Sequence, residues 1–259
     1  MESTREGRLK RILGEKGSFS RRLLLNLPHA SLYSAYDFQQ QAKIYGCQFI
    51  FGQPLIVRTL REIFSRDEAT ALNGFQYARR LATATAHSLI FDLELVGAPG
   101  VVTGAATNIA EMFSVQAYTV HLSMMGKALA AVAKAKAQKL QFGFTVPKNL
   151  EDGECRGRYN EPRHIFVRKL ALQAVHHNFD GIIVPADLVG NIAKDQQFDR
   201  LLLIAFGAKA KCQLQSGQNA ISIEEVVGYG ADLVIVDNIM PDQIGDVEAE
   251  IRAGLALRK

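Results

Sequence analysis

Eight short, strongly apolar runs recur along this 259-residue chain, and an amphipathic stretch separates each run from the next. Continuous apolar runs are typical of parallel strands that are buried on both faces of a sheet. We therefore predict eight strands, at residues 23–27, 47–51, 87–91, 117–121, 140–144, 181–184, 201–206 and 233–236.

The stretches between these runs place apolar residues at helical spacing. Pro99 suits the first turn of a helix, and Ser222 with Glu225 has the spacing of a capping box. Gly230 follows a helical stretch, where a helix commonly ends. We predict helices at about 31–45, 54–65 with 69–83, 99–113, 124–138, 161–178, 187–195, 222–229 and 243–257.

Eight strands alternating with helices over about 250 residues predict an α/β fold, a single-domain (β/α)₈ TIM barrel. A doubly wound open sheet is the alternative, but it usually has fewer strands and a glycine-rich first turn. The first turn here is Asn26-Leu27-Pro28-His29, without glycine. Because no linker-like stretch divides the chain, we predict one barrel over 21–259, preceded by a short basic helical extension at 1–20.

The net charge of +4 is concentrated at the N-terminus, since residues 1–22 hold seven basic and three acidic residues. The rest of the chain sums to zero, which makes a nucleic-acid-binding face improbable outside this segment. We expect the N-terminal segment to be a solvated helix or frayed tail. The alternative is a docking element for an acidic partner, RNA or a membrane surface.

The sequence favours a cytoplasmic protein. No apolar run approaches the roughly 18 to 20 residues needed to span a bilayer, and the start lacks a signal-peptide pattern. Cys47, Cys155 and Cys212 are far apart and lack metal-ligand spacing, which suits a reducing compartment.

In a barrel of this kind the C-terminal ends of the strands carry the site. Asp92 and Glu94 follow the third apolar run, and because alternate strand residues share a side, we expect both carboxylates to face one way. Together with His121 and Asp237 they could form an acid–base or Mg²⁺-binding cluster. The alternative is that these polar groups bond only backbone and water. Two long connections, 146–160 and 207–221, leave the same face and are expected to be functional loops.

Four segments resemble the orotidine 5′-monophosphate decarboxylase family, in order and over nearly the whole chain. FDLELVGAP at 91–99 resembles the family's F-L-D-L-K-x-H-D-I-P, and TVHLS at 119–123 resembles T-V-H-A-S. FDGIIV at 179–184 is similar to L-D-G-V-V-C, and GADLVIV at 230–236 is similar to G-A-D-Y-L-V-V. The resemblance implies the barrel fold, a dimer formed through the barrel mouths, and decarboxylation as the ancestral reaction.

The departures from the family pattern fall on the chemistry. The resemblance implies alternating Asp-Lys-Asp charges, of which Asp92 matches the first, whereas Glu94 and Gly97 occupy the lysine and second aspartate positions. Other positions that the resemblance assigns to substrate binding are mostly substituted as well. They are Asn26, Ile50, His121, Ser123, Gly207, Lys209, Gln218 (within one residue of register) and Asn238.

A carboxylate cannot replace the ammonium group that protonates a developing carbanion, and Asp237 places negative charge where a phosphate would sit. We therefore predict a decarboxylase-like barrel without decarboxylase activity, kept as an assembly or structural subunit. One alternative is a repurposed enzyme that uses Asp92, Glu94 and His121 as acid–base or Mg²⁺-binding groups. Another is a genuine decarboxylase of pyrimidine biosynthesis. We expect no cofactor, and Mg²⁺ only in the repurposed enzyme. As partners we expect a second copy or a related chain, bound through the barrel mouth as a homodimer or heteromer. A larger protein assembly is the further alternative.

Overall fold

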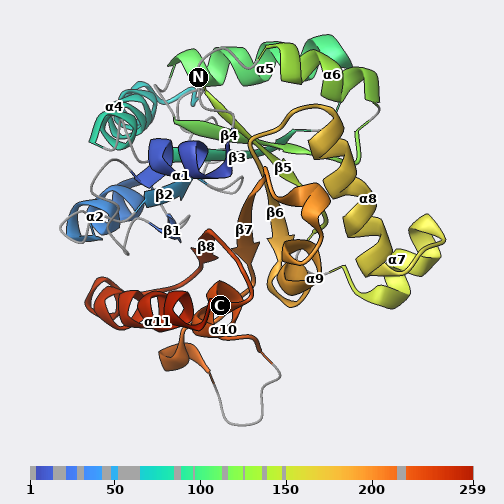
Figure 1. Cartoon of the computed structure of the whole chain (residues 1–259). Helices are drawn as coiled ribbons and strands as arrows, with labels where there is room; N and C mark the ends of the chain where they lie inside the picture. The colour runs from blue at the N-terminus through green and yellow to red at the C-terminus, as the bar shows by residue number, and fades with distance from the viewer. Residues whose placement is uncertain are drawn as a thin grey trace.

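Eight parallel strands form the centre of the molecule, seen in Figure 1, a computed structural model of the chain. The structure describes residues 4–13, 22–27, 32–42, 48–51, 65–84, 89–95, 97–112, 116–124, 126–135, 139–147, 150–214 and 220–258. The strands are β1 (Leu23–Asn26), β2 (Gln48–Phe51), β3 (Leu89–Leu95), β4 (Ala117–His121), β5 (Leu140–Phe144), β6 (Gly181–Pro185), β7 (Leu202–Phe206) and β8 (Leu233–Val236).

The strands pair in sequence order, and β1 pairs with β8 to close the sheet. The predicted α/β class and curled parallel sheet are confirmed, whereas an open doubly wound sheet would leave β1 and β8 apart. Seven of the strands lie within two residues of the predicted runs. The exception, β3, continues four residues further than expected.

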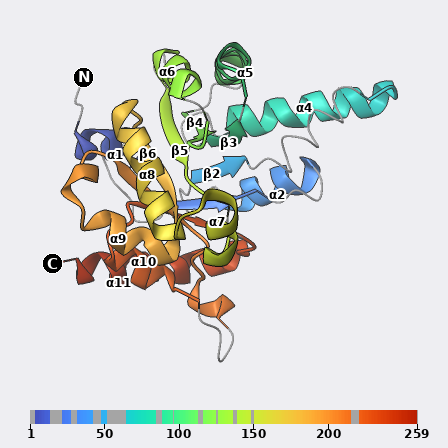
Figure 2. The same ribbon diagram turned by 90° about the vertical axis from the view of Figure 1, so that its right-hand side faces the viewer.

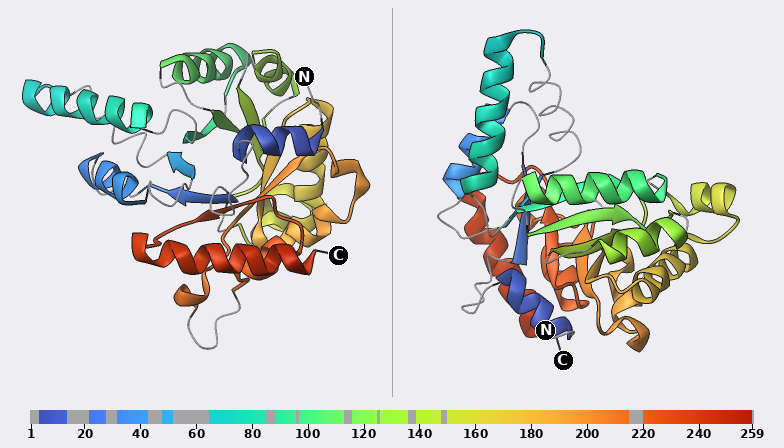
Figure 3. Two further views of the ribbon diagram at one scale, coloured as in Figure 1. Left: turned by 60° about the vertical axis from the view of Figure 1, so that its left-hand side comes forward. Right: turned by 90° about the horizontal axis from the view of Figure 1, so that it is seen from above.

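Helices surround the sheet in all views (Figures 1 and 2). Those flanking the strands are α2 (Leu32–Ala42), α4 (Glu68–Ala84), α5 (Pro99–Met112), α6 (Gly126–Lys134), α8 (Arg163–His176), α9 (Val189–Ala193), α10 (Ile223–Gly228) and α11 (Ile244–Leu257). Short 3₁₀ turns are η3 (Ala186–Leu188), η4 (Gln196–Phe198), η5 (Lys211–Gln213) and η6 (Pro241–Gln243). The helix predicted at 54–65 lies almost wholly outside the described residues, and α4 extends beyond the barrel (Figure 3).

The local signals placed helix ends correctly. Pro99 begins α5, and Ser222 caps α10 by accepting a hydrogen bond from the Glu225 backbone N–H while Glu225 accepts from Ser222. Gly230 follows α10 with a φ of 118°, a backbone conformation that favours glycine. These short-range interactions fix where the outer helices meet the strands.

The prediction of 146–160 as a continuous loop was wrong, because α7 (Asp152–Tyr159) lies inside it. The helix has one buried side chain, Cys155, and therefore lacks an apolar stripe. Polar contacts hold it instead: Asp152 accepts from Arg156 at 2.7 Å and from the Arg163 backbone at 2.8 Å. Asn160 ends the helix in the left-handed conformation.

Strand side chains divide between two apolar cores. Side chains such as Leu23, Leu25 and Phe49 point outward against the helices. Side chains such as Leu24 and Phe142 fill the inside of the barrel. Because both faces of the strands are buried, the runs are continuous in sequence rather than alternating.

The described helix of the N-terminal segment packs against the barrel, contrary to our expectation of a solvated helix or frayed tail. Helix α1 (Arg5–Leu13) lies across the N-terminal ends of the strands (Figure 3) and packs Ile12 and Leu13 into the inner core. Arg8 pairs with Asp180 at 3.1 Å, and Arg5 pairs with Asp232 at 2.9 Å.

The other end of α1 is also held by the barrel. The Gln116 side chain donates to the Arg11 carbonyl at 2.8 Å, and the Gln48 side chain donates to the Ile12 carbonyl at 3.3 Å. These two amides satisfy carbonyl groups that a helix leaves unbonded at its C-terminus. Helix α1, for which docking on a partner was the alternative interpretation, therefore docks on its own barrel. The boundary between extension and barrel stays a prediction.

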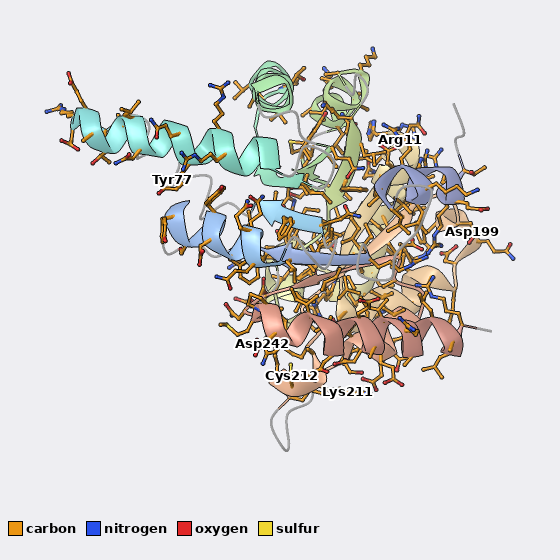
Figure 4. The ribbon with its side chains drawn as sticks, turned by 90° about the vertical axis from the view of Figure 1, so that its left-hand side faces the viewer. Arg11, Tyr77, Asp199, Lys211, Cys212 and Asp242 are labelled. Atoms are coloured by element: carbon orange, nitrogen blue, oxygen red, sulfur yellow. The ribbon has the colours of Figure 1, made fainter. Side chains whose placement is uncertain are left out.

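Both chain ends lie on the side of α1, and Figure 4 places Arg11 and Asp199 there and Asp242 at the opposite side.

Of the helices in the described ranges, none is long and apolar enough to cross a membrane.

Candidate functional site

The barrel mouth, meaning the side chains at the C-terminal ends of the strands, is polar on one half and aromatic on the other. Four half-buried polar residues lie on β1, β3, β4 and just after β8, which are near neighbours around the barrel. They are Asn26 and His121 at strand ends, Asp92 within β3, and Asp237 after β8. The ends of β5 and β7 carry Phe144 and Phe206, whose rings stack at 5.4 Å inside the barrel. The predicted site residues on the polar half are therefore brought to the same end of one barrel.

Strand β3 is irregular where its carboxylates lie. Phe91 pairs with Tyr118 and Leu95 pairs with Val120, so four steps along β3 match two along β4. Such a bulge re-aims side chains and is common beside active sites. The strict alternation from which we expected Asp92 and Glu94 to face one way does not hold across this shift. Asp92 and Glu94 also lie within the strand and not beyond its end, and the Glu94 side chain is outside the described part of the chain.

Asp92 lies deep in the mouth and accepts a hydrogen bond from the Thr119 hydroxyl at 2.6 Å. Burial raises the pKa of Asp92 to about 6, the hydrogen bond from Thr119 opposes this, and the charge of Asp237 adds to it. Among the described residues, the charged group that acts on Asp92 is thus another carboxylate. Asp92 can hold a proton just below neutral pH, which an ordinary surface aspartate cannot do.

The end of β8 is fixed from two sides. The Asn26 amide donates to Asp237 Oδ1 at 2.9 Å. The Gln213 amide, from η5, donates to the carbonyl oxygens of Asp237 at 2.9 Å and Asn238 at 3.1 Å. Asn238 has a φ of 55°, a left-handed conformation that asparagine tolerates. The sequence pointed to the loop 207–221 but not to Gln213 itself.

His121 ends β4 and is bonded to Ser123 two residues later. Nδ1 of His121 is 2.8 Å from the Ser123 hydroxyl oxygen and accepts the Ser123 backbone N–H at 3.2 Å. Because that N–H needs a lone pair, we assign the proton of the neutral ring to Nε2. Burial lowers the pKa of His121, so the ring is neutral at pH 7.

Of the other predicted site residues, Ile50 pairs with Asn26 across β1 and β2 but contributes an apolar side chain. Ile50 is buried inside the barrel, and Gly97 is an exposed bend after β3. Gly207 turns the chain after β7 with a φ of 82°. Lys209 uses its backbone to pair with Ser222. Gln218 lies outside the described residues.

Metal binding finds no support in the described residues, among which no group of three His, Cys, Asp or Glu side chains is placed to hold an ion. The Mg²⁺ alternative would need Glu94, whose side chain is not among them. The described side chains of Asp92, Asp237 and His121 can form hydrogen bonds and exchange protons.

Comparison with known proteins bears on the fold. No family model and no curated protein matches the chain. Solved structures do match: orotidine 5′-phosphate decarboxylase from Lactobacillus acidophilus has a TM-score of 0.65 at 16% identity, covering 92% of this chain and 99% of that one. The Methanocaldococcus jannaschii orotidine 5′-monophosphate decarboxylase has a TM-score of 0.64 at 17% identity, covering 92% of this chain and 98% of that one. The Pyrococcus horikoshii orotidine 5′-phosphate decarboxylase has a TM-score of 0.65 at 20% identity, covering 89% of this chain and 99% of that one. The resemblance is therefore confirmed for the fold, while identities this low leave the activity open.

Proposed function

We propose that this chain is a barrel of the orotidine 5′-phosphate decarboxylase fold that has lost decarboxylation and serves as an assembly or structural subunit. The observation that carries the proposal is the surroundings of Asp92. Its hydrogen-bond partner is the neutral Thr119 hydroxyl, and the charge that acts on it is that of Asp237. The resemblance requires a lysine ammonium group beside this aspartate.

The direction of the Asp92 pKa supports this interpretation. An ammonium group within about 4 to 6 Å would favour the ionised carboxylate and lower its pKa. The pKa of Asp92 is instead raised to about 6, by burial and by a like charge. Among the described residues, no ammonium group acts on Asp92 as the acid needed to protonate a developing carbanion would.

The remaining substitutions act in the same direction. Ile50 presents an apolar side chain, and Gly97 provides no carboxylate. Asp237 would repel a phosphate group at the end of β8. Together these changes remove charges that an anionic substrate would need.

An absorbance assay with orotidine 5′-phosphate tests the proposal. We expect no conversion above buffer, and no heat of binding when UMP is titrated in a calorimeter. A decarboxylase of known activity run in parallel is the control. Turnover abolished by Asp92→Asn would overturn the proposal and establish a genuine decarboxylase of pyrimidine biosynthesis.

The assembly role needs its own measurement. The resemblance implies pairing through the barrel mouths, so we expect light scattering to give about twice the 28.5 kDa of the chain. Substituting the exposed Asn238 by Arg should then weaken the dimer by adding a bulky charge at the mouth. A monomer at all concentrations would contradict the assembly role but leave the loss of decarboxylation standing.

A second candidate is a repurposed acid–base enzyme, favoured by the raised pKa of Asp92 beside Asp237. Two neighbouring carboxyl groups with different pKa values can serve as acid and base. Carbon-detected NMR titration of Asp92 tests it, and an ordinary pKa near 4 would remove its basis.

A further inference from the structure

The corner between β4 and α6 places a serine next to a histidine, with a helix following. The Met124 backbone N–H donates to the His121 carbonyl at 3.4 Å, and α6 begins at Gly126. Ser123 lies in this tight turn with its side chain exposed. A serine in a strand–turn–helix corner of a parallel sheet is presented to solvent, and the free N–H groups of the following helix can stabilise negative charge.

His121 is placed to activate that serine. Its Nδ1 is 2.8 Å from the Ser123 hydroxyl oxygen, within the range expected for a nucleophile and its base. The Ser123 backbone N–H also donates to this nitrogen, at 3.2 Å, so the hydroxyl and the backbone N–H share its one lone pair. The imidazole ring also packs against Phe144, with centroids 5.6 Å apart, and this contact orients it.

A cavity of mixed polarity, with a volume of about 340 Å³, opens directly beside Ser123. Its lining includes the apolar Leu122, Met124, Phe166 and Leu170 and the polar side chains of Lys169 and Gln173. Tyr159 and Phe166 stack at 4.0 Å to form an aromatic wall. The volume lies at the lower end of the range for small-molecule sites, which suits a short acyl chain or a single ring.

We propose that Ser123 and His121 form a nucleophile–base pair that hydrolyses small esters with an apolar acyl group. The Ser123 oxygen attacks the ester carbonyl while its proton moves to His121 Nδ1. That proton then passes to the departing alcohol, which leaves an acyl group on Ser123. Water, deprotonated by His121, attacks the acyl-serine, and the proton returns to the serine oxygen as the acid is released.

This reaction is independent of the fate of decarboxylation, because it uses the end of β4 and the adjoining cavity rather than Asp92. A barrel inactive on orotidine 5′-phosphate can hydrolyse esters, and an active one can fail to do so. The two proposals are therefore tested by separate substrates.

The test is hydrolysis of p-nitrophenyl butyrate by the full chain, together with labelling by a fluorophosphonate. We expect a burst of nitrophenol, and a phosphonate adduct on the peptide that contains Ser123. Ser123→Ala should remove both, and His121→Ala should slow hydrolysis by about 100-fold or more. Ser65→Ala is the control, since Ser65 lies before α4 and caps a local turn through Asp67.

A cysteine variant keeps the test decisive if His121→Ala fails to fold. In Ser123→Cys, His121 should lower the thiol pKa below its usual value of about 8.5, measured by the pH dependence of iodoacetamide alkylation. Ser65→Cys should show an ordinary thiol pKa. Hydrolysis that survives Ser123→Ala, absence of the adduct, or an ordinary thiol pKa in Ser123→Cys would each overturn the proposal.

Discussion

The two ends of the barrel treat buried carboxylates in opposite ways. At the N-terminal end, Asp180 and Asp232 lie 3% exposed and are met by the guanidinium groups of Arg8 and Arg5. At the mouth, Asp92 is met by a hydroxyl group and by the like charge of Asp237. One end pairs its buried carboxylates with guanidinium groups, whereas at the other end burial, and to a smaller extent a like charge, raise the pKa of a carboxylate.

The difference separates stability from function. A charge that is paired and hydrogen-bonded can be buried without losing its ionised form, and its removal leaves the partner uncompensated. A carboxylate beside a like charge costs free energy, and such strain persists in proteins mainly at sites that act on a ligand or proton. We therefore assign the N-terminal end to holding the barrel closed and the mouth to chemistry or recognition.

The largest effect should follow from breaking the paired end. Arg8→Ala leaves Asp180 buried without its guanidinium partner and removes the 2.5 Å bond to the Arg200 carbonyl. Loss of one partner from a buried pair costs about 3–5 kcal/mol, which urea unfolding would measure. The control is Lys10→Ala, whose exposed pair with Glu6 contributes less than about 1 kcal/mol. If the two variants unfold alike, α1 does not hold the barrel.

The mouth should respond in the opposite direction. Asp92→Asn keeps an acceptor for Thr119 but removes a charge that is repelled by Asp237 and desolvated by burial. The folded pKa, about 6, lies above the unfolded value of about 4, so the folded state binds the proton more tightly. Protonated Asp92 therefore stabilises the folded state fully below pH 4, and this stabilisation is lost as the pH rises through 6.

Asp92→Asn should therefore stabilise the protein by about 2–3 kcal/mol at pH 8 and by little at pH 4. Thermal unfolding at both pH values measures this, with exposed Asp199→Asn as a control that should change stability by less than about 0.5 kcal/mol. Destabilisation at pH 8 would mean that Asp92 has a cationic partner and would restore the similarity between the two ends.

The sequence predicted the strands because continuous apolar runs identify buried parallel strands directly. It did not predict the shift in β3, since an apolar run does not record how its residues pair with β4. The burial of α1 was missed for a related reason: Arg5 lies 227 residues from Asp232 along the chain. Composition showed an excess of positive charge but not the distant carboxylates that neutralise it.

The same distinction applies to the site. Asn26, Asp92, His121 and Asp237 were found because each stands at the end of an apolar run. Thr119 was missed because it lies inside such a run, and Gln213 because nothing local marks it among the polar residues of its loop. Thr119 could be identified only from the pairing of β3 with β4, and Gln213 only from the position of η5. Both features depend on the closed sheet.

The smallest expected effect comes from Gln213, which supports the mouth without charge. Gln213→Ala removes the bonds to the Asp237 and Asn238 carbonyls, which should cost about 1–2 kcal/mol because a typical hydrogen bond contributes about 1. Gln197→Ala, whose side chain makes one 3.3 Å bond to Asp195, should cost less than about 1 kcal/mol.

The informative measurement is the NMR titration of Asp92 in Gln213→Ala. If η5 holds Asp237 close to Asp92, its loosening lets the carboxylates separate and the pKa of Asp92 falls. A pKa of Asp92 that stays at its original value would show that η5 does not set the position of Asp237 relative to Asp92.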